Sequence, residues 1–210
     1  MYNKKMIAMM LTLSMLAASL AGCAGGDDDD DADWAISMAS DVEVVWVESA
    51  WDPIIPNLNA GEMCDVIISA MTKTEARDQV VDFTRAYYTS SQGVIGGSGS
   101  ASISDVSELN AAGITVGVQS GTTSDIFANG DADNMASLPD ATVIAYDDFP
   151  SVIAALDNGD VMYALGDAPV LSLEGTLMTQ FSDENFGFAV RETSGELLDL
   201  SLIHISEPTR

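Results

Sequence analysis

Apolar and polar positions alternate along the chain in a way that predicts short strands and helices. The β-branched runs Val42–Val47 and Thr115–Val118 are typical of buried strands. Asp148–Asn158 has the period of an amphipathic helix that ends at Gly159, with core positions spaced three and four residues apart. Those core positions are Phe149, Val152, Ile153 and Leu156. Helices and strands that alternate in this way indicate an α/β fold.

The densest set of such elements lies between Trp51 and Tyr88. The pattern predicts a helix over Trp51–Ala60, with Pro53 near its first turn and Gly61 after its end, and then a buried strand over Asp65–Ser69. Thr72-Lys-Thr-Glu75 next resembles a capping box at the start of a short helix. Arg77 therefore falls in the first turn of that helix, just past the carboxyl end of a strand, where open α/β sheets bind ligands.

The second half of the chain shows the same alternation in weaker form. Thr89–Gly99 is predicted to be a crossover segment whose glycines absorb bending, and Ser104–Leu109 is predicted to form a short helix. The strand at Thr115–Val118 leads into Gln119–Asp125, which opens a helix. From the residues alone this turn is either a helix cap or an anion site made of hydroxyl groups and free N–H groups. Tyr163–Pro169 is predicted to be a strand that runs into a turn.

Charge narrows the possible partners. The chain has 7 Lys+Arg against 33 Asp+Glu, a net charge of −26, which argues against nucleic acids and anionic membrane surfaces as partners. Between Cys23 and Leu200 the cations are Lys73, Arg77, Arg85 and Arg191. From the residues alone, Arg77 either forms a surface ion pair with a neighbouring carboxylate such as Glu75 or Asp78, or grips the carboxylate of a ligand with both of its terminal nitrogens.

The N-terminus has the pattern of a secretion signal, predicted over residues 1–22. Lys4 and Lys5 precede an apolar run that ends in Leu20-Ala-Gly-Cys23, which is similar to a lipobox. We expect cleavage before Cys23 and a lipid on its thiol; the alternative is an ordinary signal peptide with an incidental cysteine. Residues 23–33, which include the run Asp27–Asp31, are then an acidic tether, and consecutive aspartates are not expected to converge on a metal ion.

Cys64 is the other cysteine of the chain. It adjoins the predicted strand over Asp65–Ser69 and is expected to pack as a small hydrophobic residue. With Cys23 lipidated, no disulfide, zinc site or thiol nucleophile is expected.

The stretch from Trp51 to Tyr88 resembles the first lobe of the polar amino-acid-binding proteins of ABC importers, which have the type II periplasmic binding fold. The similarity follows the pattern W-D-x-I-I-P-x-L-x-A-G-x-x-x-D-V-I-I-S-A-M-T-x-T-x-x-R-x-x-x-V-D-F-T-x-x-Y-Y and extends from about Val42 to Leu198. The resemblance implies a two-lobed α/β fold with hinge crossovers. Lobe 1 covers 34–92, lobe 2 covers 93–185, and 186–200 returns to lobe 1.

The resemblance also implies a site for each end of an amino acid. Arg77 binds the α-carboxylate, and Trp51 stacks on the ligand side chain. The Ala70 carbonyl and Thr72 hydrogen-bond the amino and carboxylate groups.

In lobe 2 the turn Gly121-Thr122-Thr123 closes on the carboxylate, and Asp167 accepts hydrogen bonds from the α-ammonium. Asp167 alternatively caps a helix at Ala168-Pro169, and the two roles are compatible. Gln119 is a candidate lining residue of the side-chain pocket.

The chain departs from the family pattern in two places. The strand, the aromatic-bearing loop and most of the helix that the family places ahead of Val42 have no counterpart after Asp31, so lobe 1 is expected to be incomplete. The resemblance stops at about Leu200, and residues 201–210 are similar to a translated sequencing-adapter read-through, which makes them a non-native tail. That tail holds His204, the single histidine.

The sequence therefore predicts a lipid-anchored, extracytoplasmic, monomeric protein that captures a polar amino acid for an ABC permease, without a cofactor, a metal or catalysis. Two alternatives are a sensor or partner-binding lobe of the same fold, and a dehydratase acting on prephenate-like substrates. The dehydratase needs a general acid in the cleft, for which we find no histidine or well-placed glutamate.

Overall fold

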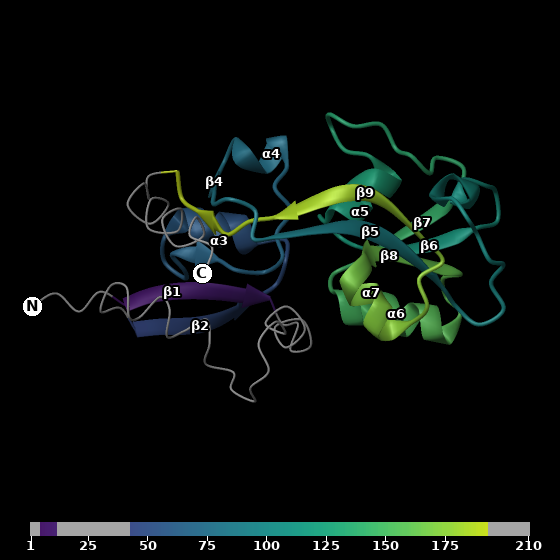
Figure 1. The fold of residues 1–210 in the computed structure, drawn as a ribbon, viewed down its shortest axis with the longest axis horizontal. Coiled ribbons are helices and arrows are strands. Elements are labelled where there is room, and N and C mark those ends of the chain that lie inside the picture. Colours follow the sequence, from purple (N-terminus) through teal and green to yellow (C-terminus); the bar gives the residue numbers. More distant parts are fainter. Residues whose placement is uncertain (1–4, 12–42, 193–210) are drawn as a thin grey trace, which may run out of the picture. The chain divides into compact units, whose positions relative to one another are not determined.

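The computed structural model describes residues 5–11 and 43–192, which divide into two compact units (Figure 1). Unit 1 comprises the described residues up to Tyr87 together with those from Phe186 onward, and unit 2 comprises Tyr88–Asn185. The chain crosses from unit 1 to unit 2 and back, and each unit contains a five-stranded sheet. The two units are described separately below.

The sheet of unit 1 has the strand order β2-β1-β3-β10-β4. Strand β1 is parallel to β2 and β3, and β10 is antiparallel to β3 and β4. Two helices, α3 and α4, join these strands. The bounds are β1 Lys5–Leu11, β2 Glu43–Ser49, α3 Ile54–Ala60, β3 Val66–Ile67, α4 Glu75–Asp78, β4 Asp82–Phe83 and β10 Ala189–Val190.

The core of unit 1 lies between α3 and the short strands. Its buried members come from α3, β3, β4, β10 and the segments next to them: Ile54, Leu58, Cys64, Ile67, Met71, Val81, Phe83 and Ala189. Trp51 and Ile55 pack against this core and are only partly buried. Cys64 is 2% exposed, which confirms the prediction that it packs as a small hydrophobic residue.

The structure differs from the sequence prediction at Lys5–Leu11. We expected this segment to be part of a signal peptide and to lie outside the fold, whereas it forms strand β1 between β2 and β3. A short apolar run is typical both of a buried parallel strand and of the centre of a signal peptide. The hydrophobic pattern alone therefore does not distinguish a strand from a signal peptide. The rest of the predicted signal peptide, Cys23 and the acidic tether lie outside the described residues.

Helix α3 confirms the predicted helix, although it begins at Ile54 rather than at Trp51. Gly61 follows it in the left-handed conformation (φ 70°), the usual way for a helix to end. The predicted capping box was wrong, because Thr74 and not Thr72 caps α4, accepting a hydrogen bond from the Arg77 backbone N–H. Thr72 and Thr74 are both possible caps in the sequence. In the structure, Thr72 pairs with Phe186 in an isolated β-bridge.

The sheet of unit 2 has the strand order β7-β6-β8-β5-β9. Strand β6 is parallel to β7 and β8, whereas β5 is antiparallel to β8. The bounds are β5 Tyr88–Gly96, the 3₁₀ helix η1 Val106–Leu109, β6 Thr115–Gln119, α5 Thr123–Asn129, β7 Thr142–Tyr146, α6 Phe149–Asn158, β8 Tyr163–Asp167, α7 Ala168–Glu174 and β9 Thr179–Phe186, which runs one residue beyond the unit.

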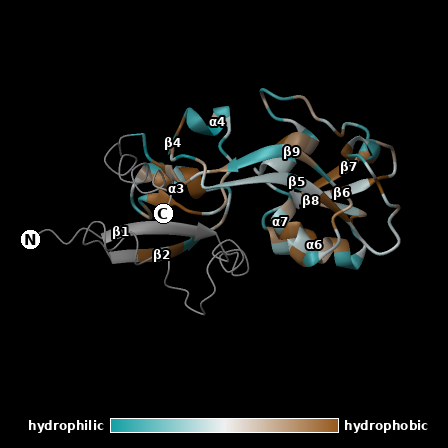
Figure 2. Ribbon diagram, in the orientation of Figure 1, coloured by the Kyte–Doolittle hydropathy of each residue, from teal (hydrophilic) through white to brown (hydrophobic). Residues whose placement is uncertain are grey.

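The apolar residues of β6 and β8 form the centre of the unit 2 core, and Figure 2 shows apolar and polar residues sharing α6. One buried cluster comprises Val94, Leu109, Val116, Val118, Ala128, Leu138, Tyr163 and Leu165. The predicted strand at Thr115–Val118 and the predicted helix from Asp148 to Gly159 are both confirmed. Within that helix Ala155 is buried, whereas Ile153 is not among the fully buried residues.

Two elements of unit 2 differ from the prediction. Ser104–Leu109 forms a shorter 3₁₀ helix that begins after Asp105. The residues after β8 form α7 rather than a turn, because a proline in the first turn of a helix is compatible with helical geometry. Within the described residues, no helix has the length and the apolar character needed to cross a membrane.

Candidate functional site

Arg77 is the centre of the unit 1 half of the site. Its side chain is 9% exposed, and its Nη1 donates to the Thr72 carbonyl oxygen at 2.9 Å. Its Cζ lies 5.2 Å from the centre of the Trp51 ring, which is a cation–π distance. The alternative of an exposed surface ion pair is therefore wrong for Arg77, because its guanidinium is buried against an aromatic ring.

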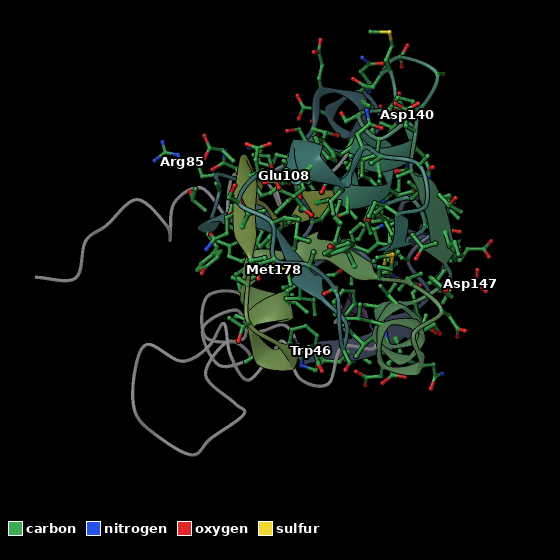
Figure 3. The ribbon with its side chains drawn as sticks, turned by 90° about the vertical axis from the view of Figure 1, so that its right-hand side faces the viewer. Trp46, Arg85, Glu108, Asp140, Asp147 and Met178 are labelled. Atoms are coloured by element: carbon green, nitrogen blue, oxygen red, sulfur yellow. The ribbon has the colours of Figure 1, made fainter. Side chains whose placement is uncertain are left out.

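The other three cations of the same range serve the fold or face solvent. Arg191 pairs with the Asp65 carboxylate at 2.8 Å and also donates to two backbone carbonyls. Lys73 donates to the Thr84 carbonyl oxygen at 2.8 Å. Figure 3 shows Arg85 extending away from the ribbon, and its side chain is exposed. Among these four described cations, Arg77 alone is buried.

The backbone turns sharply between β3 and Arg77. Ala70 has φ 49°, which lies in the left-handed region that residues with a Cβ rarely adopt. Such conformations cost about 1–3 kcal/mol and concentrate at functional sites. Ala70 lies three residues after the end of β3 and two residues before Thr72. The Thr72 carbonyl oxygen accepts the hydrogen bond from Arg77.

Ser69 is a residue of this turn that the sequence analysis missed. Its hydroxyl oxygen is buried and has no hydrogen-bond partner among the described residues. A buried hydroxyl without a partner costs about 1–3 kcal/mol, which a ligand atom could recover. Its position at the carboxyl end of a buried strand, where α/β sheets bind ligands, could have identified it.

Asp167 is the centre of the unit 2 half of the site. It stands directly before α7, but its carboxylate makes no capping hydrogen bond to that helix, so the alternative of a helix cap is not what this side chain does. Its Oδ1 instead accepts from Gln92 Nε2 at 2.7 Å. Gln92 lies directly opposite Asp167 in the antiparallel pair of β5 and β8.

The amide of Gln92 connects Asp167 to the start of α5. Its Nε2 also donates to Thr123 Oγ1 at 3.0 Å, and its Oε1 accepts from the Ser124 hydroxyl. The sequence analysis missed Gln92 and Ser124. Gln92 could have been identified from the sequence, because it directly precedes the apolar residues Gly93–Ile95 and a buried amide requires hydrogen-bond partners.

The predicted anion site at Gly121–Asp125 contains a carboxylate of its own. The Gly121 N–H donates to Asp125 Oδ2 at 3.0 Å. Thr122 Oγ1 donates to the Gln119 carbonyl oxygen at 2.7 Å and caps α5 through the Asp125 N–H. Gln119 itself is 7% exposed at the end of β6. A ligand carboxylate that uses the Gly121 N–H therefore has to displace the Asp125 side chain.

The structure thus groups the predicted residues into two sets, one in each unit. In unit 1, Arg77 contacts the Trp51 ring and the Thr72 carbonyl, and Ala70 lies in the turn that leads to Thr72. In unit 2, Asp167 and Thr123 share the amide of Gln92, whereas Gln119, Gly121 and Thr122 form the adjoining turn. Among the described residues, no group of three or more His, Cys, Asp or Glu side chains could hold a metal ion.

Residues 31–200 match the model of the bacterial extracellular solute-binding proteins, family 3. The chain belongs to this family. The match covers unit 2, the part of unit 1 from β2 onward and most of the 210 residues, but not β1. Membership confirms the resemblance stated from the sequence.

Among curated relatives, the chain is 25% identical over 170 residues to a Neisseria gonorrhoeae protein named "probable histidine-binding protein", which covers 75% of the chain and 60% of the relative. It is 32% identical over 148 residues to the lysine/arginine/ornithine-binding periplasmic protein of Escherichia coli K12, covering 70% and 54%. The chain therefore spans little more than half the length of these relatives. Both are named as binding proteins, in agreement with the prediction of capture rather than catalysis.

Among solved structures, the chain is similar to an ancestral amino acid-binding protein described as a precursor of cyclohexadienyl dehydratase. The identity is 26%, the TM-score is 0.77, and the similarity covers 93% of this chain and 85% of that one. The structure of holo ArgBP from T. maritima shares the fold, with 24% identity, a TM-score of 0.77 and coverage of 96% and 88%. The type II periplasmic binding fold predicted from the sequence is confirmed.

Proposed function

We propose that this protein captures a polar amino acid outside the cytoplasm and delivers it to an ABC-type importer. The observation that carries the proposal is the buried guanidinium of Arg77 beside the Trp51 ring, in a chain with a net charge of −26. The Thr72 carbonyl and the Trp51 ring stabilise this cation, and a ligand carboxylate adds charge-assisted hydrogen bonds to it. Membership of an extracellular solute-binding family supports the same role.

In this proposal the α-carboxylate of the ligand binds Arg77 and the hydroxyl of Thr72. The Ala70 carbonyl and the Asp167 carboxylate accept from the α-ammonium, and Trp51 covers the ligand side chain. The Ser69 hydroxyl, buried without a partner among the described residues, supplies a further hydrogen bond.

The unit 2 turn adds the remaining contacts. The Thr123 hydroxyl donates to the carboxylate. The Thr122 hydroxyl does so only by giving up its hydrogen bond to the Gln119 carbonyl, and the Gly121 N–H only once Asp125 has moved away. Gln119 lines the pocket for the ligand side chain. In this proposal the ligand-bound form is the one that the permease recognises.

A basic side chain is the first choice for the ligand. The acidic surface attracts cationic solutes and repels anionic ones. Figure 3 shows some of the outward-facing carboxylates, among them Asp140 and Asp147. The curated relatives described above are named for histidine and for lysine, arginine and ornithine.

A thermal-shift screen of the twenty common L-amino acids tests the proposed function. Ligands that bind the folded state raise the unfolding midpoint, and L-arginine and L-histidine are expected to give the largest shifts. Arg77→Ala should remove the shift, whereas Arg85→Ala, the loss of an exposed arginine in the same unit, should keep it. A wild-type protein that no amino acid stabilises contradicts the proposal.

We also propose, from the sequence, that Cys23 carries a lipid that anchors the mature chain outside the cytoplasm. Cleavage before Cys23 removes Lys5–Leu11, so processing and strand β1 compete for the same residues. Mass spectrometry of the N-terminus decides between them, and a diacylglycerol-modified Cys23 is the expected result. Cys23→Ala should abolish membrane association, whereas Cys64→Ala should not; an unprocessed N-terminus overturns the anchor.

The mature protein is proposed to act as a monomer. Size-exclusion chromatography with light scattering should give the mass of a single chain with and without L-arginine. A stable dimer contradicts this part of the proposal.

A further inference from the structure

Gln92 is a buried amide at the start of an apolar segment. It lies on β5, is 2% exposed, and is followed by the fully buried Val94 and Ile95. Placing an amide in such surroundings costs free energy unless its hydrogen bonds are satisfied. Both N–H groups of Gln92 and its carbonyl oxygen have side-chain partners in the structure, so its side chain is held in one orientation.

The partners of Gln92 come from two other segments. Asp167 is 75 residues away in sequence, at the end of β8, and Thr123 is 31 residues away, at the start of α5. Ser124 adds a hydrogen bond from the next residue of α5. Gln92 therefore fixes the position of α5 relative to the end of β8, in the interior of unit 2.

We propose that Gln92 is a positioning residue that makes the site selective for α-amino acids over the corresponding acids without an amino group. The inference rests on the proposed function, in which Asp167 holds the ammonium and Thr123 donates to the carboxylate. Because Asp167 Oδ1 accepts from Gln92, the carboxylate cannot rotate freely, and Oδ2 keeps a fixed direction. Because Thr123 Oγ1 also accepts from Gln92, the proton of that hydroxyl points to another acceptor.

The direction of its N–H groups distinguishes this role from ordinary core packing. A residue that only packs needs no particular donors, whereas the two N–H groups of Gln92 are directed at the two side chains assigned to opposite ends of the ligand. Loss of those N–H groups should therefore change which ligand is preferred, and not only how tightly every ligand is bound.

The test replaces Gln92 with methionine, which keeps the length of the side chain and removes its hydrogen bonds. The matched control is Gln180→Met, because Gln180 is exposed on β9 and also hydrogen-bonds a β5 side chain, accepting from Ser91 at 2.7 Å. Calorimetry compares L-arginine with 5-guanidinopentanoate, and L-histidine with 3-(imidazolyl)propionate.

Wild type and Gln180→Met should prefer the amino acid of each pair by about 100-fold. Gln92→Met should reduce that preference by about tenfold or more, because loss of the donor to Asp167 weakens binding of the amino acid alone, whereas loss of the donor to Thr123 weakens both members of a pair equally. An equal loss for both members of a pair indicates a purely structural role and overturns the proposal.

A second variant covers the case in which Gln92→Met does not fold. Gln92→Glu keeps the shape and the acceptor for Ser124, but it directs an acceptor at Asp167 in place of a donor. Preference for the amino acid should again fall, whereas unchanged preference in a folded Gln92→Glu protein overturns the proposal.

A ligand-free measurement separates failure of this inference from failure of the proposed function. If wild type binds no probe, the proposed function is wrong, and the role of Gln92 is judged by urea unfolding of Gln92→Met, Asp167→Ala and the double variant. A double variant less destabilised than the sum of the single variants supports the positioning contact. Additive losses overturn it.

Discussion

The two halves of the candidate site are built in opposite ways. In unit 1 the residues come from one continuous stretch, Trp51 to Arg77, and the central contact is a single buried cation beside a ring. In unit 2 they come from three separate segments, joined by the amide of Gln92. A local half-site can be recognised in a sequence, whereas one that depends on distant segments becomes visible only once the chain is folded.

The two halves also differ in charge. Unit 1 presents a guanidinium, and unit 2 presents the carboxylates of Asp167 and Asp125. The proposed function assigns the carboxylate of a zwitterionic ligand to Arg77 and its ammonium to Asp167. The following predictions test this comparison.

Arg77→Ala should have the largest effect, because it removes the cation of the unit 1 half-site. Affinity for L-arginine should fall by about 2–5 kcal/mol, the typical result of removing one member of a buried charge pair. Arg77→Lys should restore only part of it, because an ammonium cannot grip a carboxylate with two parallel hydrogen bonds. Calorimetry with Arg85→Ala as the control measures both changes, and wild-type affinity in Arg77→Ala removes Arg77 from the site.

Asp167→Asn should have the next largest effect, and it tests the unit 2 half-site. The change keeps the shape and one acceptor oxygen but removes the charge that pairs with the ligand ammonium, so affinity should fall by about 2–3 kcal/mol. The loss is measured by calorimetry with L-arginine. The same titration with 5-guanidinopentanoate, which has no ammonium, should show little change; an equal loss would mean that Asp167 acts only on folding.

Cys64 should make the stability of unit 1 depend on pH in the alkaline range. Burial, with a smaller contribution from the Asp65 charge, raises the pKa of its thiol from 9.0 to about 11, and Arg191 offsets part of the rise. A raised pKa in the folded state means that its stabilising contribution is complete below about pH 9 and is lost as the pH rises toward about pH 11.

Between pH 8 and pH 10 this thiol should account for about 1 kcal/mol of the fall in the free energy of unfolding. Urea unfolding at several pH values measures the fall, and Cys64→Ala is the control in which that part of the slope should vanish. An identical slope in wild type and Cys64→Ala contradicts the assignment.

Asp125→Asn should have the smallest effect and the opposite sign. The Asp125 carboxylate accepts from the Gly121 N–H that the ligand carboxylate is proposed to use, so loss of its charge should tighten binding by about 0.5 kcal/mol. The measurement is the affinity for L-arginine. Weaker binding in a folded Asp125→Asn protein would show that the turn does not contact the ligand carboxylate.

Much of the fold was predictable because its elements have local causes. Asp148 caps the start of α6 and Gly159 follows its end, and the β-branched residues of Thr115–Val118 predict β6. Arg77 could likewise be placed in the first turn of a helix, from the strand before it and the threonines between them.

The parts that were missed depend on tertiary contacts or on ambiguous patterns. Gln92 is linked to Asp167 only through the pairing of β5 with β8, which no short pattern specifies. Lys5–Leu11 has the apolar character of both a signal peptide and a strand, and only its pairing with β2 and β3 distinguishes the strand. The capping residue of α4 was mispredicted because Thr72 and Thr74 both fit the pattern of a helix cap.

The central claim is that Arg77 holds the ligand carboxylate and Asp167 its ammonium. A calorimetric comparison of L-arginine with agmatine, which lacks the carboxylate, tests it most directly in wild type, Arg77→Ala and Asp167→Asn. Wild type and Asp167→Asn should prefer L-arginine over agmatine. Arg77→Ala should lose that preference, because it lacks the guanidinium that binds the carboxylate. An undiminished preference for L-arginine in Arg77→Ala would contradict the account.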